Sequence, residues 1–349
     1  MFHRRFTALS TESEPTNGSV GRCSFATALG ACRRNFSGIR QQHTRATAIG
    51  SEPTDVAPVG FKCYYSMRAP RVMRRAPDCA PPLVIDAPFL GQSLVALHRS
   101  AVLERFGEAA RAGFRGVEFA FAYDLPERAI ADRLAKHGLE CVLINAPPGD
   151  YAAGERGIAA LPGREKEFAA SFSTALRYAA AFGCPRIHVM AGLVSDDERR
   201  AESKATFISN LRHACETARA QGVTVLIEAL NPRDVPNYLF STVSEAHAIR
   251  EAVEAPNIKA QMDLYHTQVA EGDVATKLER WLLHIGHIQI AGTPGRHEPD
   301  VGEVNYAWLL RRIDELGYDG WVGCEYRPLT TTAAGLSWRD RLVPLRPIV

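Results

Sequence analysis

Several common signatures are missing from this chain, and each absence removes a class of protein. No run of apolar residues is long enough to cross a bilayer, so we expect no transmembrane helix and no membrane partner. The eight cysteines form no CxxC pair, and none lies near a histidine at zinc-finger spacing, so we expect buried, reduced thiols. The chain also lacks GxGxxG after a strand and GxxxxGK followed by Ser or Thr, the glycine motifs of nucleotide-binding folds.

Charge is distributed unevenly along the 349 residues, whose net charge is +2. Residues 1–83 contain twelve Lys and Arg against five Asp and Glu, whereas residues 84–349 contain 29 against 34. Nucleic-acid-binding domains usually carry a basic patch. The mildly acidic balance of residues 84–349 therefore argues against a nucleic-acid partner.

Residues 1–83 differ from the rest in composition. They are rich in Arg, Ser, Thr, Ala and Gly and show no sustained periodicity, so we expect a disordered basic extension. Such an Arg- and Ser-rich, acid-poor segment is typical of an organelle transit peptide, which would place the protein in an organelle matrix. A non-conserved extension, or a start codon assigned too far upstream, would leave the protein cytoplasmic, which is the location we expect.

From about residue 84, apolar runs alternate with helical patterns. Near-continuous apolar strands separated by helices indicate parallel strands that are covered on both faces. Segment 81–97 is the weakest candidate for a further, eighth strand. Eight β/α units in residues 84–349 match the size of a TIM barrel, about 250 residues, so we predict an α/β fold of the TIM (β/α)8 type. A doubly wound open sheet is the competitor. The seven clearest strand runs are 116–121, 141–146, 186–192, 224–230, 258–264, 286–291 and 320–326.

Helical patterns fill the intervals between these runs. Residues 100–113 and 306–320 both end near glycine, as helix C-termini often do. Residues 241–253 begin with Ser and Thr, and Glu245 follows at the spacing of an N-terminal capping box.

Polar residues stand near the ends of four consecutive predicted strands. The four are Glu228, Asp263, Gln289 and Glu325. In a TIM barrel, the chemistry sits at the C-terminal ends of the strands, so these side chains converge at one side of the barrel mouth. A single carboxylate there is often a helix cap or half of an ion pair, but these roles do not readily explain the whole set.

Three carboxylates buried together are costly unless a positive charge neutralises them. Apart from Lys259 at the start of run 258–264, no Lys or Arg lies inside these strand segments, and a divalent cation would neutralise the carboxylates. Three carboxylates and one amide oxygen form a hard, oxygen-rich set suited to Mg²⁺ or Mn²⁺. The carbonyl oxygen of Gln289 completes this set.

A metal ion that holds a carbonyl and a neighbouring hydroxyl acidifies the C–H bond between them and stabilises an ene-diolate. Two carboxylates on opposite sides then move protons between the adjacent carbons. Glu228 and Glu325, three strands apart, form the natural pair. The pattern predicts isomerisation of the aldose–ketose type.

Four longer motifs resemble the hydroxypyruvate isomerase family, which belongs to the xylose isomerase-like TIM barrels. The motifs are AAGERGIAALPGREKEF, QMDLYHTQVAEGD, HIQIAGTPGRHEPDVGEVNY and ELGYDGWVGCEY. The resemblance covers about residues 98–340. It implies that Glu228 and Glu325 are the proton donor and acceptor, and that Glu228, Asp263, Gln289 and Glu325 are the metal ligands.

The same resemblance implies contacts with a small keto-acid substrate. By analogy with the wider superfamily, His266 and Arg296 contact substrate oxygens, and Arg296 could grip a carboxylate bidentately. His188 either faces the mouth or is a satisfied core histidine. The best-known reaction of the family interconverts hydroxypyruvate and 2-hydroxy-3-oxopropanoate (tartronate semialdehyde), and a close branch resembles 2-oxo-tetronate isomerase. An endonuclease-like relative, a non-catalytic sugar-acid binder and a homo-oligomer stay open.

Overall fold

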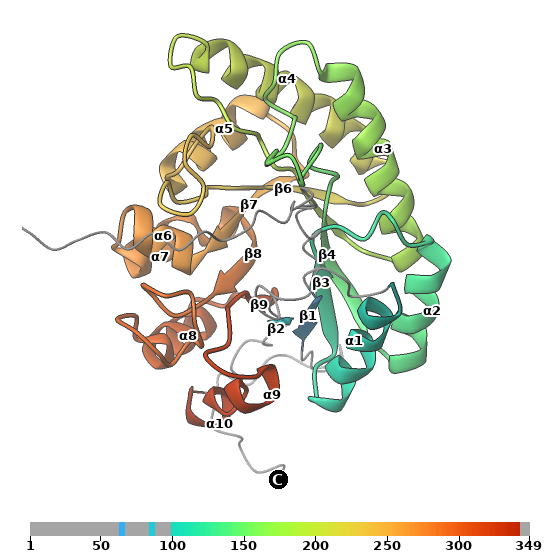
Figure 1. Ribbon diagram of the computed structural model, residues 1–349. Helices are drawn as coiled ribbons and strands as arrows, with labels where there is room; N and C mark the ends of the chain where they lie inside the picture. The colour runs from blue at the N-terminus through green and yellow to red at the C-terminus, as the bar shows by residue number, and fades with distance from the viewer. Residues whose placement is uncertain (1–62, 67–83, 88–98, 343–349) are drawn as a thin grey trace, which may run out of the picture. The chain divides into compact units, whose positions relative to one another are not determined.

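The computed structural model describes the backbone of residues 63–66, 84–87 and 99–342, and the side chains of residues 102–342 (Figure 1). The chain divides into Met1–Pro53 and Thr54–Val349, and every described element belongs to the second unit. The expectations for residues 1–83 therefore lie outside the described residues, with one exception. Residues Cys63–Ser66 form a strand, β1.

A single parallel sheet of seven strands forms the centre of the second unit. The strands lie side by side in chain order, so each is hydrogen-bonded to the next along the sequence (Figure 1). Each strand coincides with one of the seven predicted runs, and the prediction of a TIM-type barrel is confirmed. The strands are β3 (Gly116–Phe119), β4 (Glu140–Asn145), β5 (Arg186–His188), β6 (Thr224–Glu228), β7 (Ile258–Asp263), β8 (Ile285–Ile290) and β9 (Val322–Cys324).

Helices surround this sheet and connect successive strands (Figure 1). The three helices predicted from the sequence correspond to α1 (Arg99–Arg111), α5 (Val243–Val253) and α8 (Tyr306–Glu315). None of the helices in the described part of the chain is long and apolar enough to cross a membrane. The helices are α1 (Arg99–Arg111), α2 (Glu127–His137), α3 (Glu165–Phe182), α4 (Arg200–Arg219), α5 (Val243–Val253), α6 (Leu264–Ala270), α7 (Val274–Trp281), α8 (Tyr306–Glu315), α9 (Thr332–Gly335) and α10 (Trp338–Leu342), with a 3₁₀ turn η1 (Leu282–His284).

The start of α5 follows the predicted capping pattern. The Thr242 hydroxyl accepts a hydrogen bond from the backbone N–H of Glu245 at 3.2 Å, and the Glu245 carboxylate accepts from the backbone N–H of Thr242 at 3.0 Å. These two bonds satisfy donors that a helix N-terminus otherwise leaves without partners. The predicted capping box is confirmed.

The eighth strand predicted within residues 81–97 does not extend the parallel sheet. Val84–Ala87 is a strand, β2, but it pairs antiparallel with β1. Both strands of this hairpin lie close to β3 and β9, the two edge strands of the seven-stranded sheet. Within the described residues, a hairpin therefore stands where a TIM barrel has its remaining parallel strand.

The apolar core lies mainly between the sheet and the helices, as expected of a barrel. Aromatic side chains such as Phe106, Phe119 and Phe168 are buried in this layer. The interior of the barrel is more polar: Glu118, Gln261 and His287 are buried on strands that otherwise carry apolar residues. The strands therefore place polar groups inside the barrel below its C-terminal end.

Candidate active site

The four predicted ligand residues lie at the C-terminal ends of adjacent strands. In the sheet register Glu228 lies opposite Gln261, and Asp263 lies opposite Gln289. Glu325 follows directly after β9. All four side chains are buried, with at most 6 % of each residue exposed. The predicted convergence at one side of the barrel mouth is therefore observed.

A compact group of possible metal ligands forms at this point. Glu228, Asp263 and His266 each offer a ligand atom, and these atoms lie within 4.8 Å of one another. His266 belongs to α6, which begins directly after β7 and so continues from Asp263. Two carboxylates and an imidazole at this spacing fit a divalent metal ion.

Arg296 reaches the carboxylates from the loop after β8. Its Nη2 lies 3.1 Å from Asp263 Oδ2 and 3.0 Å from Glu325 Oε1. A positive charge therefore does reach the buried carboxylates, although it comes from a loop and not from a strand. The predicted ligand set contains three carboxylates, and Arg296 supplies one positive charge. The excess of negative charge that is left favours a divalent cation.

The loop after β8 folds back on itself and thereby returns Arg296 to the mouth. The backbone N–H of Gly292 donates to the carbonyl of His297 at 2.8 Å, and the N–H of Arg327 donates to the Arg296 carbonyl at 2.6 Å. A Cβ atom on Gly292 would overlap the Val301 carbonyl oxygen, so only glycine fits there. Below Arg296 lies the Tyr265 ring, 4.9 Å from the guanidinium.

Tyr265 is also tied to the same cluster through Asp234. Burial, followed by its hydrogen bond to Asp234, raises the pKa of Tyr265 to about 12. Asp234 Oδ2 lies 3.8 Å from Arg296 Nη1. The tyrosine thus stays protonated at neutral pH and acts as a hydrogen-bond donor beneath the arginine.

Asn231 determines which nitrogen of His266 carries the hydrogen. The backbone N–H of Asn231 donates to His266 Nδ1 at 3.1 Å, and the Asn231 side-chain nitrogen lies 2.7 Å from the same atom. A backbone N–H can only donate, so Nδ1 must accept and Nε2 must carry the hydrogen. His266 Nε2, 3.7 Å from Asp263 Oδ2, is therefore a donor. This favours the predicted contact with a substrate oxygen over direct metal ligation by His266.

His188 on β5 lies beside Glu228. It is buried, and its Nε2 is 3.8 Å from Glu228 Oε2. The structure therefore places this histidine at the edge of the predicted site. Its contact with a substrate stays a prediction.

Three site residues were not identified from the sequence: Glu118, Gln261 and His287. Gln261 Nε2 donates to Glu228 Oε2 at 2.9 Å and to Gln289 Oε1 at 2.6 Å, and Gln289 Nε2 donates to Glu118 Oε1 at 2.7 Å. A usable signal was present, because each of these polar residues interrupts an apolar strand. Gln261 also precedes Asp263 by two positions, which places both on the same face of β7.

His287 lies against Glu118 inside the barrel. Burial, followed by the nearby charge of Arg186, moves the pKa of His287 well below its ordinary value. Burial therefore favours the neutral imidazole, which offers one N–H donor.

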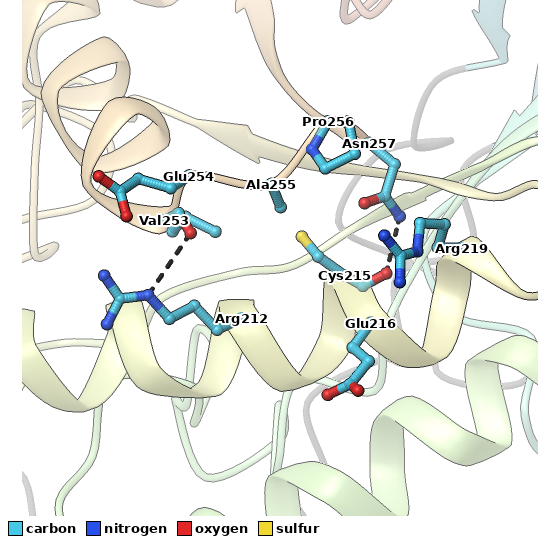
Figure 2. Close-up of a pocket in the computed structure, with 9 residues that line it drawn as sticks. All are labelled: Arg212, Cys215, Glu216, Arg219, Val253, Glu254, Ala255, Pro256 and Asn257. Carbon is cyan, nitrogen blue, oxygen red and sulfur yellow. Dashed lines mark hydrogen bonds between the residues drawn. The ribbon is translucent and has the colours of Figure 1, made fainter.

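A cleft of about 240 Å³ lies elsewhere, between the C-terminal half of α4 and the loop that precedes β7 (Figure 2). Because Asn257 directly precedes β7, this cleft is at the N-terminal ends of the strands, opposite the carboxylates. Burial raises the pKa of the Cys215 thiol to about 12, which favours the protonated thiol over the thiolate. Arg212 donates to the backbone carbonyls of Val253 and Ala252. Side chains that line the cleft therefore bond to backbone carbonyls and join α4 to the loop before β7.

The comparison with known proteins agrees with this geometry. A sequence model of the family described as "Xylose isomerase-like TIM barrel" matches residues 106–342. A 2-oxo-tetronate isomerase from Cupriavidus necator is 55% identical over 238 residues, which are 68% of this chain and 92% of that protein. A hydroxypyruvate isomerase from Escherichia coli is 43% identical over 238 residues, with the same coverage of 68% and 92%.

A solved structure is similar as well. The crystal structure of an AP endonuclease, family 2, from Brucella melitensis matches with a TM-score of 0.67 and 46% identity, over 69% of this chain and 93% of that one. The chain therefore belongs to the xylose isomerase-like TIM-barrel family and, within it, to the hydroxypyruvate and 2-oxo-tetronate isomerases.

Proposed function

We propose that the protein is an isomerase that moves a carbonyl group between adjacent carbons of a short hydroxy-oxo acid. The observation that carries this proposal is the pair of buried carboxylates, Glu228 and Glu325, at the ends of β6 and β9. Asp263 lies on a strand between them, and Arg296 bridges Asp263 and Glu325. Two carboxylates held apart in this way can act as general base and general acid in one proton transfer.

We propose Mg²⁺ or Mn²⁺ as the cofactor, held by Glu228, Asp263, Gln289 and Glu325. The hard oxygen donors and the excess of negative charge at the mouth support this set. When bound, such an ion stabilises negative charge on the oxygens of an ene-diolate.

The residues of the chain then have distinct tasks. One of the two glutamates removes the proton from the carbon that bears the hydroxyl group, and the other returns a proton to the neighbouring carbon. The hydroxyl proton passes to the former carbonyl oxygen at the ene-diolate stage, so the carbonyl and the hydroxyl group exchange places. His266 Nε2–H donates to a substrate oxygen, because Asn231 holds the ring in the required tautomer. The Nη1 edge of Arg296, whose contact with Asp234 is the longest of its ion pairs at 3.8 Å, binds the substrate carboxylate.

We propose a four-carbon 2-oxo-tetronate as the preferred substrate. The relative with this name is 55% identical, whereas the relative named hydroxypyruvate isomerase is 43% identical. Conversion between hydroxypyruvate and tartronate semialdehyde is therefore the second candidate. Both reactions use the same proton transfer, so they differ only in the pocket around the additional carbon.

A nuclease function is the alternative that the name of the Brucella protein raises. The mouth of this barrel presents three buried carboxylates and one arginine that is already paired with two of them. A DNA backbone requires the opposite charge balance. We therefore propose a small-molecule substrate and no nucleic acid.

The deciding experiment is an isomerisation assay in D₂O with Mn²⁺, comparing three-carbon and four-carbon acids and following the products by proton NMR. Proton transfer through a carboxylate exchanges with solvent, so we expect deuterium at the carbon that receives the proton. A chelator-treated sample is the control for metal dependence. Turnover without any deuterium incorporation would contradict the proton-transfer mechanism, and absence of turnover of both acids would contradict the proposed function.

A further inference from the structure

A continuous chain of side-chain hydrogen bonds crosses the interior of the barrel. It begins at Glu118 on β3, passes through Gln289 on β8 and Gln261 on β7, and ends at Glu228 on β6. The three donor–acceptor distances are 2.7, 2.6 and 2.9 Å, and all four residues are at most 5 % exposed. The chain thus joins β3, on the far side of the barrel, to the proposed site.

The chain has a direction that the chemistry of its members imposes. A glutamine amide offers oxygen at one end and an NH₂ group at the other. The NH₂ end of Gln289 faces Glu118 and donates to it, which is the orientation that an ionised carboxylate, able only to accept, requires. The Gln289 oxygen must then lie at the opposite end, where it accepts from Gln261 Nε2.

Gln261 holds two proposed ligand oxygens together. Its single side-chain nitrogen has two hydrogens, and it donates one to Glu228 Oε2 and the other to Gln289 Oε1. Each of these acceptor oxygens has a second lone pair, so a hydrogen bond from Gln261 leaves it able to bind a cation as well.

Strand β9 makes room for this arrangement. A Cβ atom at Gly323 would lie 2.6 Å from Glu118 Oε1, 2.9 Å from Gln289 Cγ and 3.0 Å from His287 Nε2. Such approaches are shorter than any ordinary contact, so a side chain at this position would displace the network. Glu118, Gln289 and His287 therefore occupy the space that a side chain at Gly323 would fill.

We propose that Glu118 and Gln261 are positioning residues that hold the Gln289 side-chain oxygen toward Glu228 as a preformed ligand for the divalent metal ion. This inference rests on the proposed function, because it assigns these residues to the metal site of that same reaction. Neither residue contacts the substrate. Both act on Gln289, because Glu118 accepts from its NH₂ group and Gln261 donates to its oxygen. Without them the amide could turn its NH₂ group toward the cation and repel it.

Purely structural filling is the competing explanation, and the packing argues against it. An apolar side chain of the same volume fills a barrel interior without the desolvation cost of a buried polar network. Gln261 Oε1 is buried and has no hydrogen-bond partner among the described residues, so this glutamine is not the best filler for stability alone.

The first test is Gln261→Met, which keeps the length of the side chain and removes both donors. Binding of Mn²⁺ to the metal-free protein, measured by titration calorimetry, should weaken by about 10-fold to 100-fold, as is usual when a partner of a metal ligand is lost. The control is Gln268→Met, the same substitution at a partly exposed glutamine on α6 whose side chain donates to Glu303, away from the network. It should bind Mn²⁺ as the wild type does, and circular dichroism checks the fold of both.

The second test asks whether Gln261 acts through Gln289. In a double-mutant cycle, Gln261→Met should have little further effect on Mn²⁺ affinity once Gln289→Ala is present. An undiminished effect in that background would show that Gln261 acts on Glu228 alone and would overturn the assignment.

A third set of variants examines the same chain without Gln261, in case Gln261→Met does not fold. Glu118→Gln can still accept from Gln289 Nε2 and should keep most of the affinity, whereas Glu118→Met should lose it. Gly323→Ala leaves every polar group in place but displaces them, and it should weaken binding too.

The outcomes separate this inference from the proposed function. Normal Mn²⁺ affinity in both Gln261→Met and Glu118→Met, with normal wild-type binding, would overturn the inference and leave the proposed function standing. Absence of Mn²⁺ binding by the wild type would overturn the metal role itself, and the inference with it. Activity without metal would then still be measurable in the isomerisation assay.

Discussion

The barrel mouth and the N-terminal end of the same barrel both contain buried or partly buried polar side chains, but the bonds described above go to different partners. At the mouth they bond to one another: Gln261 to Glu228, and Arg296 to Asp263 and Glu325. At the N-terminal end they bond to backbone carbonyls, as Asn257 does to Cys215 (Figure 2) and to Val223. Side chain to side chain bonds are the smaller class in proteins.

This difference separates a site from a scaffold. A side chain that donates to a backbone carbonyl fixes a loop against a helix, and this role is structural. A network of side chains, by contrast, holds ionisable groups where their chemistry can be used, at a desolvation cost that stability alone does not justify. Substitutions at the mouth should therefore change chemistry, and substitutions at the other end should change stability.

The largest expected effect is at the two glutamates of the mouth. Glu228→Gln and Glu325→Gln should each lower kcat by about 10²-fold to 10⁴-fold, because an amide cannot accept the transferred proton. Steady-state kinetics on the preferred acid measures this, and thermal unfolding monitors stability. Full activity in either variant would show that the proton-transfer pair is wrongly assigned.

The next effect is expected at Gln289 itself. Gln289→Ala removes a proposed metal ligand. Loss of a residue that only hydrogen-bonds to a ligand usually weakens metal binding by roughly 10-fold or more, so Mn²⁺ binding should weaken by at least this factor. Calorimetry on the metal-free protein gives the affinity. If only the melting temperature changes and the affinity does not, the side chain serves packing alone.

Asn257 provides the opposite case at the other end of the barrel. Its Nδ2 donates to the carbonyls of Cys215 at 2.8 Å and Val223 at 3.1 Å, so Asn257→Ala leaves two carbonyl groups without this partner. The free energy of unfolding should fall by about 1–3 kcal/mol, with kcat and metal affinity unchanged. Urea denaturation measures the free energy of unfolding. A change in kcat at constant fold would break the contrast between the two ends.

Features that depend on local sequence pattern could be predicted from the sequence. Contacts that form only when the barrel closes could not. The seven strands, the capping box at Thr242 and the convergence of Glu228, Asp263, Gln289 and Glu325 follow from alternation along one chain. Arg296 was expected at the substrate, and its pairing with two carboxylates depends on how the loop after β8 folds back. The bond between Glu118 and Gln289 joins residues 171 positions apart, and local pattern contains no information about it.

The eighth strand shows the same limit. Segment 81–97 does contain a strand, β2, but its partner is β1, from a segment that the composition assigned to the extension. Strand pairing is decided by the edges that neighbouring strands offer, and these exist only once the sheet has formed.

The smallest expected effect concerns pH and the helices outside the barrel. His247 on α5 stacks on Trp281 of α7, with ring centroids 4.0 Å apart, and its Nδ1 accepts from Arg250 at 3.3 Å. Burial first, and then the positive charges of Arg250, His284 and Arg280, lower the pKa of His247 to about 3. In the unfolded chain its pKa is about 6.5.

Between these two values the unfolded state binds more protons, so the stability supplied by neutral His247 is complete above about pH 6.5 and is lost as the pH falls toward 3. From pH 6 to pH 5 the expected loss is up to about 1 kcal/mol. His247→Phe keeps the ring on Trp281 and removes the titration, so its stability should depend less on pH over this interval. Equal slopes for variant and wild type, measured by urea denaturation at each pH, would show that acid sensitivity arises at the carboxylates of the mouth and not in the scaffold.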